Sequence, residues 1–384
     1  MKKICIITTV AITLESFVVE TAINLYKTEG YDITLICDHN PDFAASLPEY
    51  LHYIPVKMGR GIDFKALGSI KELYKILKKG KFDLVQYSTP NASCYASIAA
   101  FLARIPVRIY AQWGIRYVGL GGFSRKIFKF IEKIVCRLST NIRAVSFKNM
   151  QFAIDERLYK SEKASVIGNG GTIGVDMTDY DLQKKEAWRQ EIRNKYALSE
   201  SDFVFGFVGR ISADKGCFEL LESFKNLSAE NENLKLMIIG PKEENCSISK
   251  DLLDWADKSK AVIFTDLVAK RDMKAYYSAI DVLVHPTYRE GFGMVIQEAG
   301  ALAISVITTD IPGASEVMEN GVSCLLVKPK NTSELQNAMK FLAETPEKVS
   351  QLGDAAFKRT KELYARPIML ENQRIDYKKL LSGE

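Results

Sequence analysis

Two glutamates flank a glycine-containing turn in the stretch YREGFGMVIQEAG, residues 288–300. Glu290 and Glu298 stand eight positions apart, and Gly291 and Gly293 lie between them. Because these glycines have no Cβ, a ligand can approach their backbone closely. The apolar run after Gly293 predicts a helix, whose first amide groups would suit a phosphate while Glu298 accepts bonds from sugar hydroxyls. Taken alone, this segment is better explained by a loop glutamate and a solvated helix glutamate.

A second loop carries two cations, in the stretch FVFGFVGRISADKG, residues 203–216. A buried strand is predicted to end at Gly209, and Arg210 and Lys215 follow it. Ligands of open parallel sheets bind beyond the carboxyl ends of the strands, where this loop lies. The fork of an arginine and the point charge of a lysine could neutralise a diphosphate. Charges on a solvated loop are the alternative, but the Glu290 turn in the same half of the chain favours a nucleotide-diphosphate pocket.

The 384 residues are predicted to form alternating strands and helices, which position these two loops. Near-continuous apolar strands with helical crossovers predict parallel sheets covered on both faces. Twelve strands are too many for one sheet of usual size, so we expect two doubly wound α/β domains, joined near the Gly- and Asp-rich segment 168–181. The predicted strands are 3–9, 32–37, 52–56, 82–88, 107–113 and 142–146, then 203–209, 234–240, 261–266, 281–286, 304–309 and 323–328. The clearest helices are 14–29, 64–80, 91–104 and 122–139.

Composition places the chain among ordinary globular proteins, with 47% hydrophobic and 26% charged residues. The N-terminal run MKKICIITTVAITLESF is interpreted as a first strand rather than a signal peptide, and no stretch reaches the roughly 18 apolar residues of a membrane span. The cysteines are scattered singly, which predicts reduced core thiols in a cytosolic protein. They are Cys5, Cys37, Cys94, Cys136, Cys217, Cys246 and Cys324.

Positive charge is concentrated in the first half of the chain. Residues 1–170 carry 24 Lys and Arg against 14 Asp and Glu, and much of the excess lies in two predicted helices, about 64–81 and 122–139. In the second helix four basic residues recur at intervals of four: Arg125, Lys129, Lys133 and Arg137. A basic amphipathic helix can rest on an anionic membrane, although a core helix with a solvated lysine face has the same pattern. The modest excess and the lack of a recognised motif argue against nucleic acid.

Neither a metal site nor a dinucleotide-binding site is expected. The chain has only three histidines, His39, His52 and His285, and no clustered cysteines, so zinc is not expected. The segment DYD at 179–181 imitates an Asp-x-Asp metal pair, but it lies in the predicted linker and is interpreted as polar linker. The glycine-rich segments miss the G-x-G-x-x-G spacing, and a GxxxxGK loop is missing from the sequence.

The two loops together resemble the donor domain of the retaining family 4 glycosyltransferases. GRISADKG, 209–216, is followed about eighty residues later by EGFGMVIQEAG, 290–300, and WGIRY, 113–117, and GNGGTIGVD, 168–176, are similar to the branch that assembles bacterial capsule and O-antigen. The resemblance implies the GT-B fold, with two Rossmann-like domains facing across a cleft. It implies an acceptor-binding domain at 1–172, with a C-terminal helix at about 365–384 crossing back to it, and a donor-binding domain at 173–364.

The resemblance also implies a reaction. A sugar, expected to be an N-acetylhexosamine or a related sugar, would pass with retention from a UDP-sugar to a polyprenyl-diphosphate-linked saccharide at the cytoplasmic face of the membrane, without a metal. Carried over by position, the catalytic set is Arg210 and Lys215 on the diphosphate and Glu290 beside the donor sugar, while Glu298 holds the ribose. The other donor-binding positions are Gly209, Gly291, Phe292, Gly293 and Met294.

The acceptor side departs from the family pattern. Ser88 and Trp113 occupy places where many relatives carry a histidine, and the paired glycines of the first turn are missing. The acceptor-side candidates are Thr13, Glu15, Ser88, Asn91, Arg116 and Tyr117. Two alternatives stay open: a GT-B epimerase of UDP-sugars, which the scarcity of histidine disfavours, and a non-catalytic sensor of nucleotide sugars, which the intact donor set disfavours.

Overall fold

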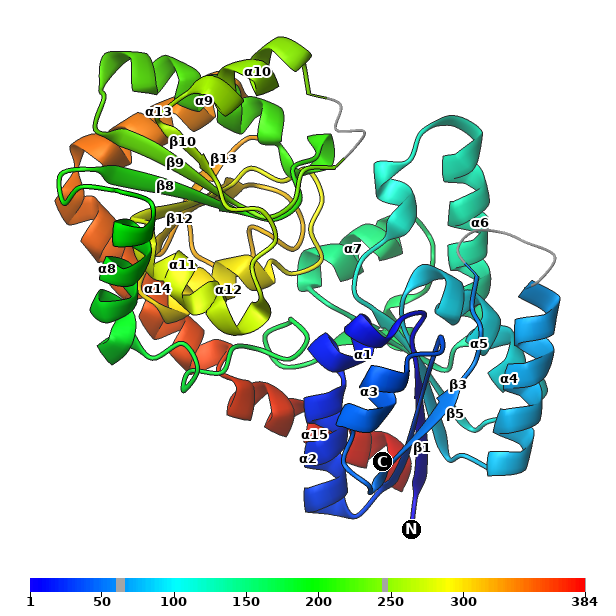
Figure 1. Ribbon diagram of the computed structural model, residues 1–384. Coiled ribbons are helices and arrows are strands. Elements are labelled where there is room, and N and C mark those ends of the chain that lie inside the picture. Colours follow the sequence, from blue (N-terminus) through cyan, green and yellow to red (C-terminus); the bar gives the residue numbers. More distant parts are fainter. Residues whose placement is uncertain (60–65, 244–247, 384) are drawn as a thin grey trace. The chain divides into compact units, whose positions relative to one another are not determined.

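The computed structural model describes residues 1–59, 66–243 and 248–383. They form two compact units, Met1–Ile173 with Pro367–Glu384, and Gly174–Arg366. Each unit is built on a parallel sheet with helices on both faces (Figure 1). The predicted thiol Cys246 and the first residues of the predicted basic helix, 64 and 65, lie outside the described residues.

The sheet of the first unit has seven strands in the described part, in the order β3-β2-β1-β4-β5-β6-β7. Their bounds are β1 Lys3–Ile7, β2 Asp32–Cys37, β3 Leu51–Pro55, β4 Leu84–Tyr87, β5 Val107–Gln112, β6 Asn141–Ala144 and β7 Ala164–Val166. The first six are the predicted strands. The seventh, β7, was not predicted, because three half-buried residues give no apolar run.

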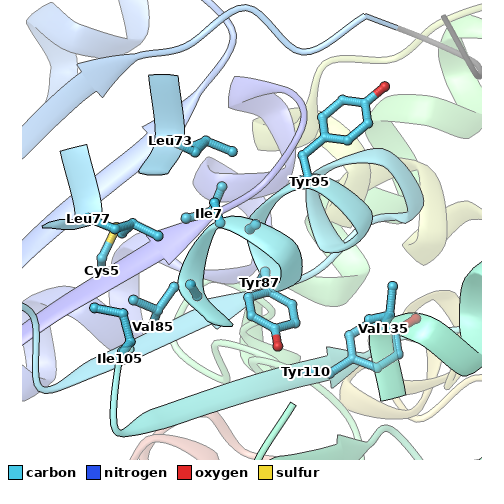
Figure 2. Packing of buried hydrophobic residues seen from close by; sticks show 14 of the residues in the cluster. Cys5, Ile7, Leu73, Leu77, Val85, Tyr87, Tyr95, Ile105, Tyr110 and Val135 are labelled. Carbon is cyan, nitrogen blue, oxygen red and sulfur yellow. The ribbon is translucent and has the colours of Figure 1, made fainter. Parts of the chain in front are cut away.

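Helices cover both faces of this sheet. They are α1 Ala11–Phe17, α2 Val19–Glu29, α3 Pro41–Ser46, α4 Ala66–Gly80, α5 Pro90–Leu102, α6 Gly122–Leu138, α7 Phe147–Asp155 and α15 Arg366–Ser382, with 3₁₀ turns η1 Arg116–Gly119 and η2 Ser161–Lys163. The apolar core under α4, α5 and α6 includes Leu73, Tyr95 and Val135 (Figure 2). On the opposite face, Tyr377 and Leu381 of α15 pack into the core formed by α1 and α2. The predicted helix 14–29 is two helices, which meet at Val18.

The sheet of the second unit has six strands among the described residues, in the order β10-β9-β8-β11-β12-β13. The strands are β8 Phe203–Val208, β9 Leu234–Ile239, β10 Val262–Phe264, β11 Val282–His285, β12 Ser305–Thr309 and β13 Leu325–Val327, all as predicted within a few residues. The helices are α8 Lys185–Lys195, α9 Cys217–Glu230, α10 Lys250–Lys258, α11 Met273–Ala279, α12 Met294–Ala301, α13 Thr332–Glu344 and α14 Pro346–Leu363, with turns η3 Leu182–Lys184, η4 Ala213–Lys215 and η5 Lys270–Asp272.

Each sheet has one point where the strand order reverses. In the first unit β1 pairs with β4, and in the second β8 pairs with β11, so the crossovers on the two sides leave in opposite directions. The loops that follow such a pair of strands separate and leave a crevice for a ligand. The Arg210 loop follows β8 and the Glu290 turn follows β11, so both predicted ligand loops lie at the switch point of the second unit.

Candidate functional site

The loop after β8 lies directly against the loop after β11. Gly216 has φ +70°, and a Cβ there would stand 2.0 Å from the carbonyl oxygen of Pro286. Only glycine fits this approach without moving backbone. The Tyr288 amide donates to the Asp214 carbonyl over 2.9 Å, which joins the two loops a second time. The β8 loop, including Lys215, is therefore held beside the Glu290 turn by backbone contacts.

Glu290 is bound on both of its oxygens. Its Oε2 lies 2.9 Å from Lys215 Nζ and 3.1 Å from His285 Nε2. Its Oε1 accepts a hydrogen bond from the Gly291 amide over 3.1 Å. Two of the three predicted catalytic residues, Lys215 and Glu290, are thus in direct contact, and the third partner is a histidine at the end of β11.

The charges of this cluster follow from burial and contact. Burial by itself would raise the pKa of Glu290, but the hydrogen bond from His285 and the charge of Lys215 outweigh it and hold that pKa well below its usual range. Burial lowers the pKa of His285, so the imidazole is neutral and donates from Nε2 to the carboxylate. Its Nδ1 has no hydrogen-bond partner within the described ranges. The cluster is a carboxylate and an ammonium joined to a neutral imidazole.

A glycine beyond β12 supports the turn from its other side. Gly313 has φ +87°, and a Cβ there would lie 2.2 Å from the Gly291 carbonyl oxygen and 2.7 Å from that of Glu290. The Gly313 amide donates to Glu316 Oε2 over 3.1 Å. The next residue, Ala314, is fully buried. Gly313 therefore packs so closely against the backbone of the turn that no side chain fits there.

Glu298 lies in a different environment on α12. Its Oε2 accepts a hydrogen bond from Tyr277 Oη over 2.8 Å. Burial raises its pKa, against the hydrogen bonds from Tyr277 and Tyr180, which lower it. The helix begins at Met294 as predicted, and Ile296 and Ala299 are among its fully buried residues. The environments of the two glutamates of the motif thus shift their pKa values in opposite directions.

Arg210 contacts a partner that the sequence did not reveal. Its guanidinium forms an ion pair with Glu243, and its side chain is 54% exposed. The pair is near the surface, so it holds the arginine weakly. Arg210 therefore extends from the β8 loop, and its guanidinium is accessible to solvent.

Several residues of the site were missed by the sequence analysis. Tyr180, in the segment interpreted as polar linker, is buried, and its ring lies 6.2 Å from that of Tyr277. Tyr288 donates to both carboxylate oxygens of Glu219. The position of His285 at a strand end was the only signal for its role, because neither its burial nor its contact with Glu290 can be read from spacing.

In the first unit the corresponding edge is formed by the loops after β1 and β4. The Thr9 amide donates to Thr89 Oγ1 over 3.1 Å, and the two hydroxyls share a hydrogen bond of 2.8 Å. The Ala92 amide, in the first turn of α5, donates to Thr9 Oγ1 over 3.3 Å. Thr89 has φ +65°, a strained conformation for a β-branched residue. Strain of this kind is concentrated at functional sites, and neither threonine was predicted.

The predicted acceptor-side residues differ in their exposure. Ser88 is fully buried, and its Oγ has no partner among the described residues. On α1, Thr13 is half-buried and Glu15 is exposed. Asn91 is half-buried on α5 and donates to the Gly59 carbonyl.

Arg116 and Tyr117 lie on η1 and have opposite surroundings. Arg116 is exposed, with its guanidinium 4.9 Å from the centre of the Phe128 ring. Tyr117 is buried and donates to Glu156 Oε2 over 3.2 Å. Arg116 therefore has a solvent-facing cation, whereas Tyr117 contributes packing, and their contact with an acceptor stays a prediction.

Neither a metal cluster nor a membrane span occurs in the part of the chain that the structure describes. Over 1–59, 66–243 and 248–383, no three His, Cys, Asp or Glu side chains converge as metal ligands would. Over the same ranges, no helix combines the length and the apolar character needed to cross a bilayer.

Two family models match this chain, one in each unit. Residues 189–359 match the family "Glycosyl transferases group 1", and residues 3–148 match "Glycosyl transferase 4-like". The chain is 29% identical over 350 residues to the capsular polysaccharide biosynthesis glycosyltransferase CapM of Staphylococcus aureus, covering 91% of this chain and 90% of that protein. It is 24% identical over 321 residues to the UDP-Gal:alpha-D-GlcNAc-diphosphoundecaprenol alpha-1,3-galactosyltransferase of Escherichia coli, covering 82% and 81%.

A solved structure agrees over the full length. Anabaena Alr3699/HepE in complex with UDP and glucose superposes with a TM-score of 0.79 at 20% identity, covering 100% of both chains. Likeness at this identity shows the fold, and the two family matches cover both units. The chain is a group 1 glycosyltransferase of the retaining family 4, with the GT-B fold.

Proposed function

We propose that this enzyme transfers an N-acetylhexosamine or a related sugar from a UDP-sugar to a polyprenyl-diphosphate-linked saccharide, with retention, during assembly of a capsule or another surface polysaccharide. The observation that carries the proposal is the contact of Lys215 with Glu290 at the switch point of the second unit, 2.9 Å between Nζ and Oε2. It joins a cation suited to a diphosphate and a carboxylate suited to sugar hydroxyls at one sheet edge.

In this reaction the bond between the anomeric carbon and the UDP phosphate breaks, and a bond to the acceptor oxygen forms on the same face. The acceptor proton passes to the leaving phosphate. Arg210 and Lys215 would stabilise the charge that develops on UDP, a role that fixed cations perform without a metal. The Gly291–Met294 backbone would contact the diphosphate or the donor sugar, Glu290 the hydroxyls of that sugar, and Glu298 the ribose.

The nature of the acceptor is supported by a relative and by surface charge. The Escherichia coli relative is named for a diphosphoundecaprenol-linked acceptor. Basic residues gather on α4 and α6 of the first unit, the helices predicted to meet an anionic membrane. A lipid-linked acceptor would require the enzyme to work at the cytoplasmic face of the membrane. The loops with Thr9 and Thr89 join Arg116 and the other predicted residues as acceptor-side candidates.

The test is UDP release from a panel of UDP-sugars in EDTA, with and without membranes that bear polyprenyl-diphosphate sugars. Release from one donor, strongly increased by the membranes, would support both the donor class and the metal-independent reaction. Recovery of UDP-sugar with an inverted ring carbon, without release, would identify an epimerase. Tight binding of UDP-sugar without either change would identify a sensor and contradict the proposal.

A further inference from the structure

Helix α6 has a well-defined inward face. Phe128, Ile131 and Val135 pack into the core of the first unit. Between them, Glu132 is buried and accepts hydrogen bonds from Tyr110 Oη over 2.9 Å and from Gln112 Nε2 over 2.7 Å. The rotation of the helix is thereby fixed, so the opposite face is turned to solvent.

That opposite face carries large apolar side chains. Phe123 is 76% exposed and Phe130 is 64% exposed, and they are seven residues apart, on the same side of the helix. Ile127 and Ile134, half-buried, lie next to them at the same helical spacing. Val118, on the 3₁₀ turn that precedes the helix, is also exposed. These five residues are here called the apolar ridge. Their transfer from water into a non-aqueous phase would be favourable, because their side chains are apolar.

The basic residues of α6 divide into two groups, which the sequence did not distinguish. Arg125 and Lys129, two members of the predicted four-residue row, lie near Glu156, with Lys129 in direct contact and Arg125 Nη2 at 3.9 Å. Both are stacked over the Tyr117 ring. The other members, Lys133 and Arg137, are exposed together with Lys126. In the described part of the chain these three have no ion pair with a carboxylate.

We propose that the apolar ridge of α6 inserts into the interface of an anionic bilayer, with Lys126, Lys133 and Arg137 against the lipid phosphates. A helix lies in the membrane plane when one side is apolar and its flank is basic, and phenylalanine is favoured at that depth. The exposed cations select an anionic surface over a neutral one. This inference rests on one part of the proposed function, namely that the acceptor is located in a membrane.

Flotation with vesicles that contain no glycan acceptor tests the insertion apart from catalysis. Wild type should float with vesicles of 70% phosphatidylcholine and 30% phosphatidylglycerol and not with pure phosphatidylcholine. Phe123→Ser with Phe130→Ser should bind at least about tenfold more weakly. Lys126→Gln and Lys133→Gln should each weaken binding about fivefold. The matched control is Phe341→Ser, an aromatic residue 46% exposed on α13 of the second unit, which should bind like wild type.

A second variant reports depth directly. Because the chain has three tryptophans of its own, the signal is the difference in emission between Phe130→Trp and wild type. That difference should shift to shorter wavelength and be quenched by brominated lipid on anionic vesicles only. Failure of wild type to float, or equal flotation of the double serine variant, would overturn the inference, as would an unquenched Trp. UDP release with a detergent-solubilised acceptor measures the proposed function separately, because that assay needs no bilayer.

Discussion

The contact between Gly313 and the Glu290 turn yields the sharpest prediction. In Gly313→Ala the new Cβ would lie 2.2 Å from the Gly291 carbonyl oxygen, whereas ordinary van der Waals contact begins at 3.4 Å. The obstacle is backbone, which cannot rotate away as a side chain can. The turn must therefore retreat by about 1 Å, and a displacement of that size at a reacting centre costs roughly 10²-fold in rate.

Backbone strain adds a cost that must be separated from this displacement. Gly313 has φ +87°, so any side chain is strained there by about 1 kcal/mol. Gly321 offers the matched control, because it has φ +76° and nothing lies within 4 Å of its Cβ position. Gly321→Ala should lose similar stability from strain and keep its activity.

The measurement is kcat/KM for UDP release, together with thermal unfolding of both variants. We expect Gly313→Ala to lose about two orders of magnitude in kcat/KM while it remains folded. A rate near wild type would refute the inference that the position of the turn limits catalysis. An equal loss in Gly321→Ala would attribute the effect to strain instead.

Four further predictions concern single side chains. Arg210→Ala should lose at least about 10²-fold in kcat/KM, with the melting temperature almost unchanged, because its pair with Glu243 is near the surface. The pKa of Glu290 is lowered by folding, so its contribution to stability is complete above its ordinary value of 4.5 and is lost as the pH falls; urea titrations should show a smaller loss below pH 4.5 in Glu290→Gln than in wild type. His285→Gln, which can still donate to Glu290, should retain about tenfold more kcat/KM than His285→Leu. Thr89→Gly should unfold at a higher temperature than Thr89→Ala, by the equivalent of about 1 kcal/mol, because both lose the hydroxyl but only glycine relaxes φ +65°.

The sequence was sufficient where the signal is local. Buried strands such as Phe203–Val208 are apolar along their whole length, and glycine residues mark the turns that follow them. Both ligand loops were therefore predicted at one sheet edge. Contacts between side chains that are distant in the sequence could not be predicted from it. The pairing of Arg210 with Glu243 depends on the conformation of a surface side chain. The division of the α6 cations depends on Glu156, which follows α7, and the spacing of residues along α6 cannot predict that contact.

Under the proposed function, the Lys215–Glu290 pair would exchange partners when the donor binds. Without ligand, the ammonium neutralises Glu290, since the two atoms are 2.9 Å apart. The diphosphate of the proposed donor brings more negative charge than one carboxylate, so Lys215 would be drawn toward it and its hold on Glu290 would weaken. His285 and the Gly291 amide, at 3.1 Å each, would then remain to keep the carboxylate ionised and aligned with the proposed donor sugar. A neutral histidine is suited to that role, because it donates a hydrogen bond without adding a positive charge that would compete with Lys215 for the phosphate.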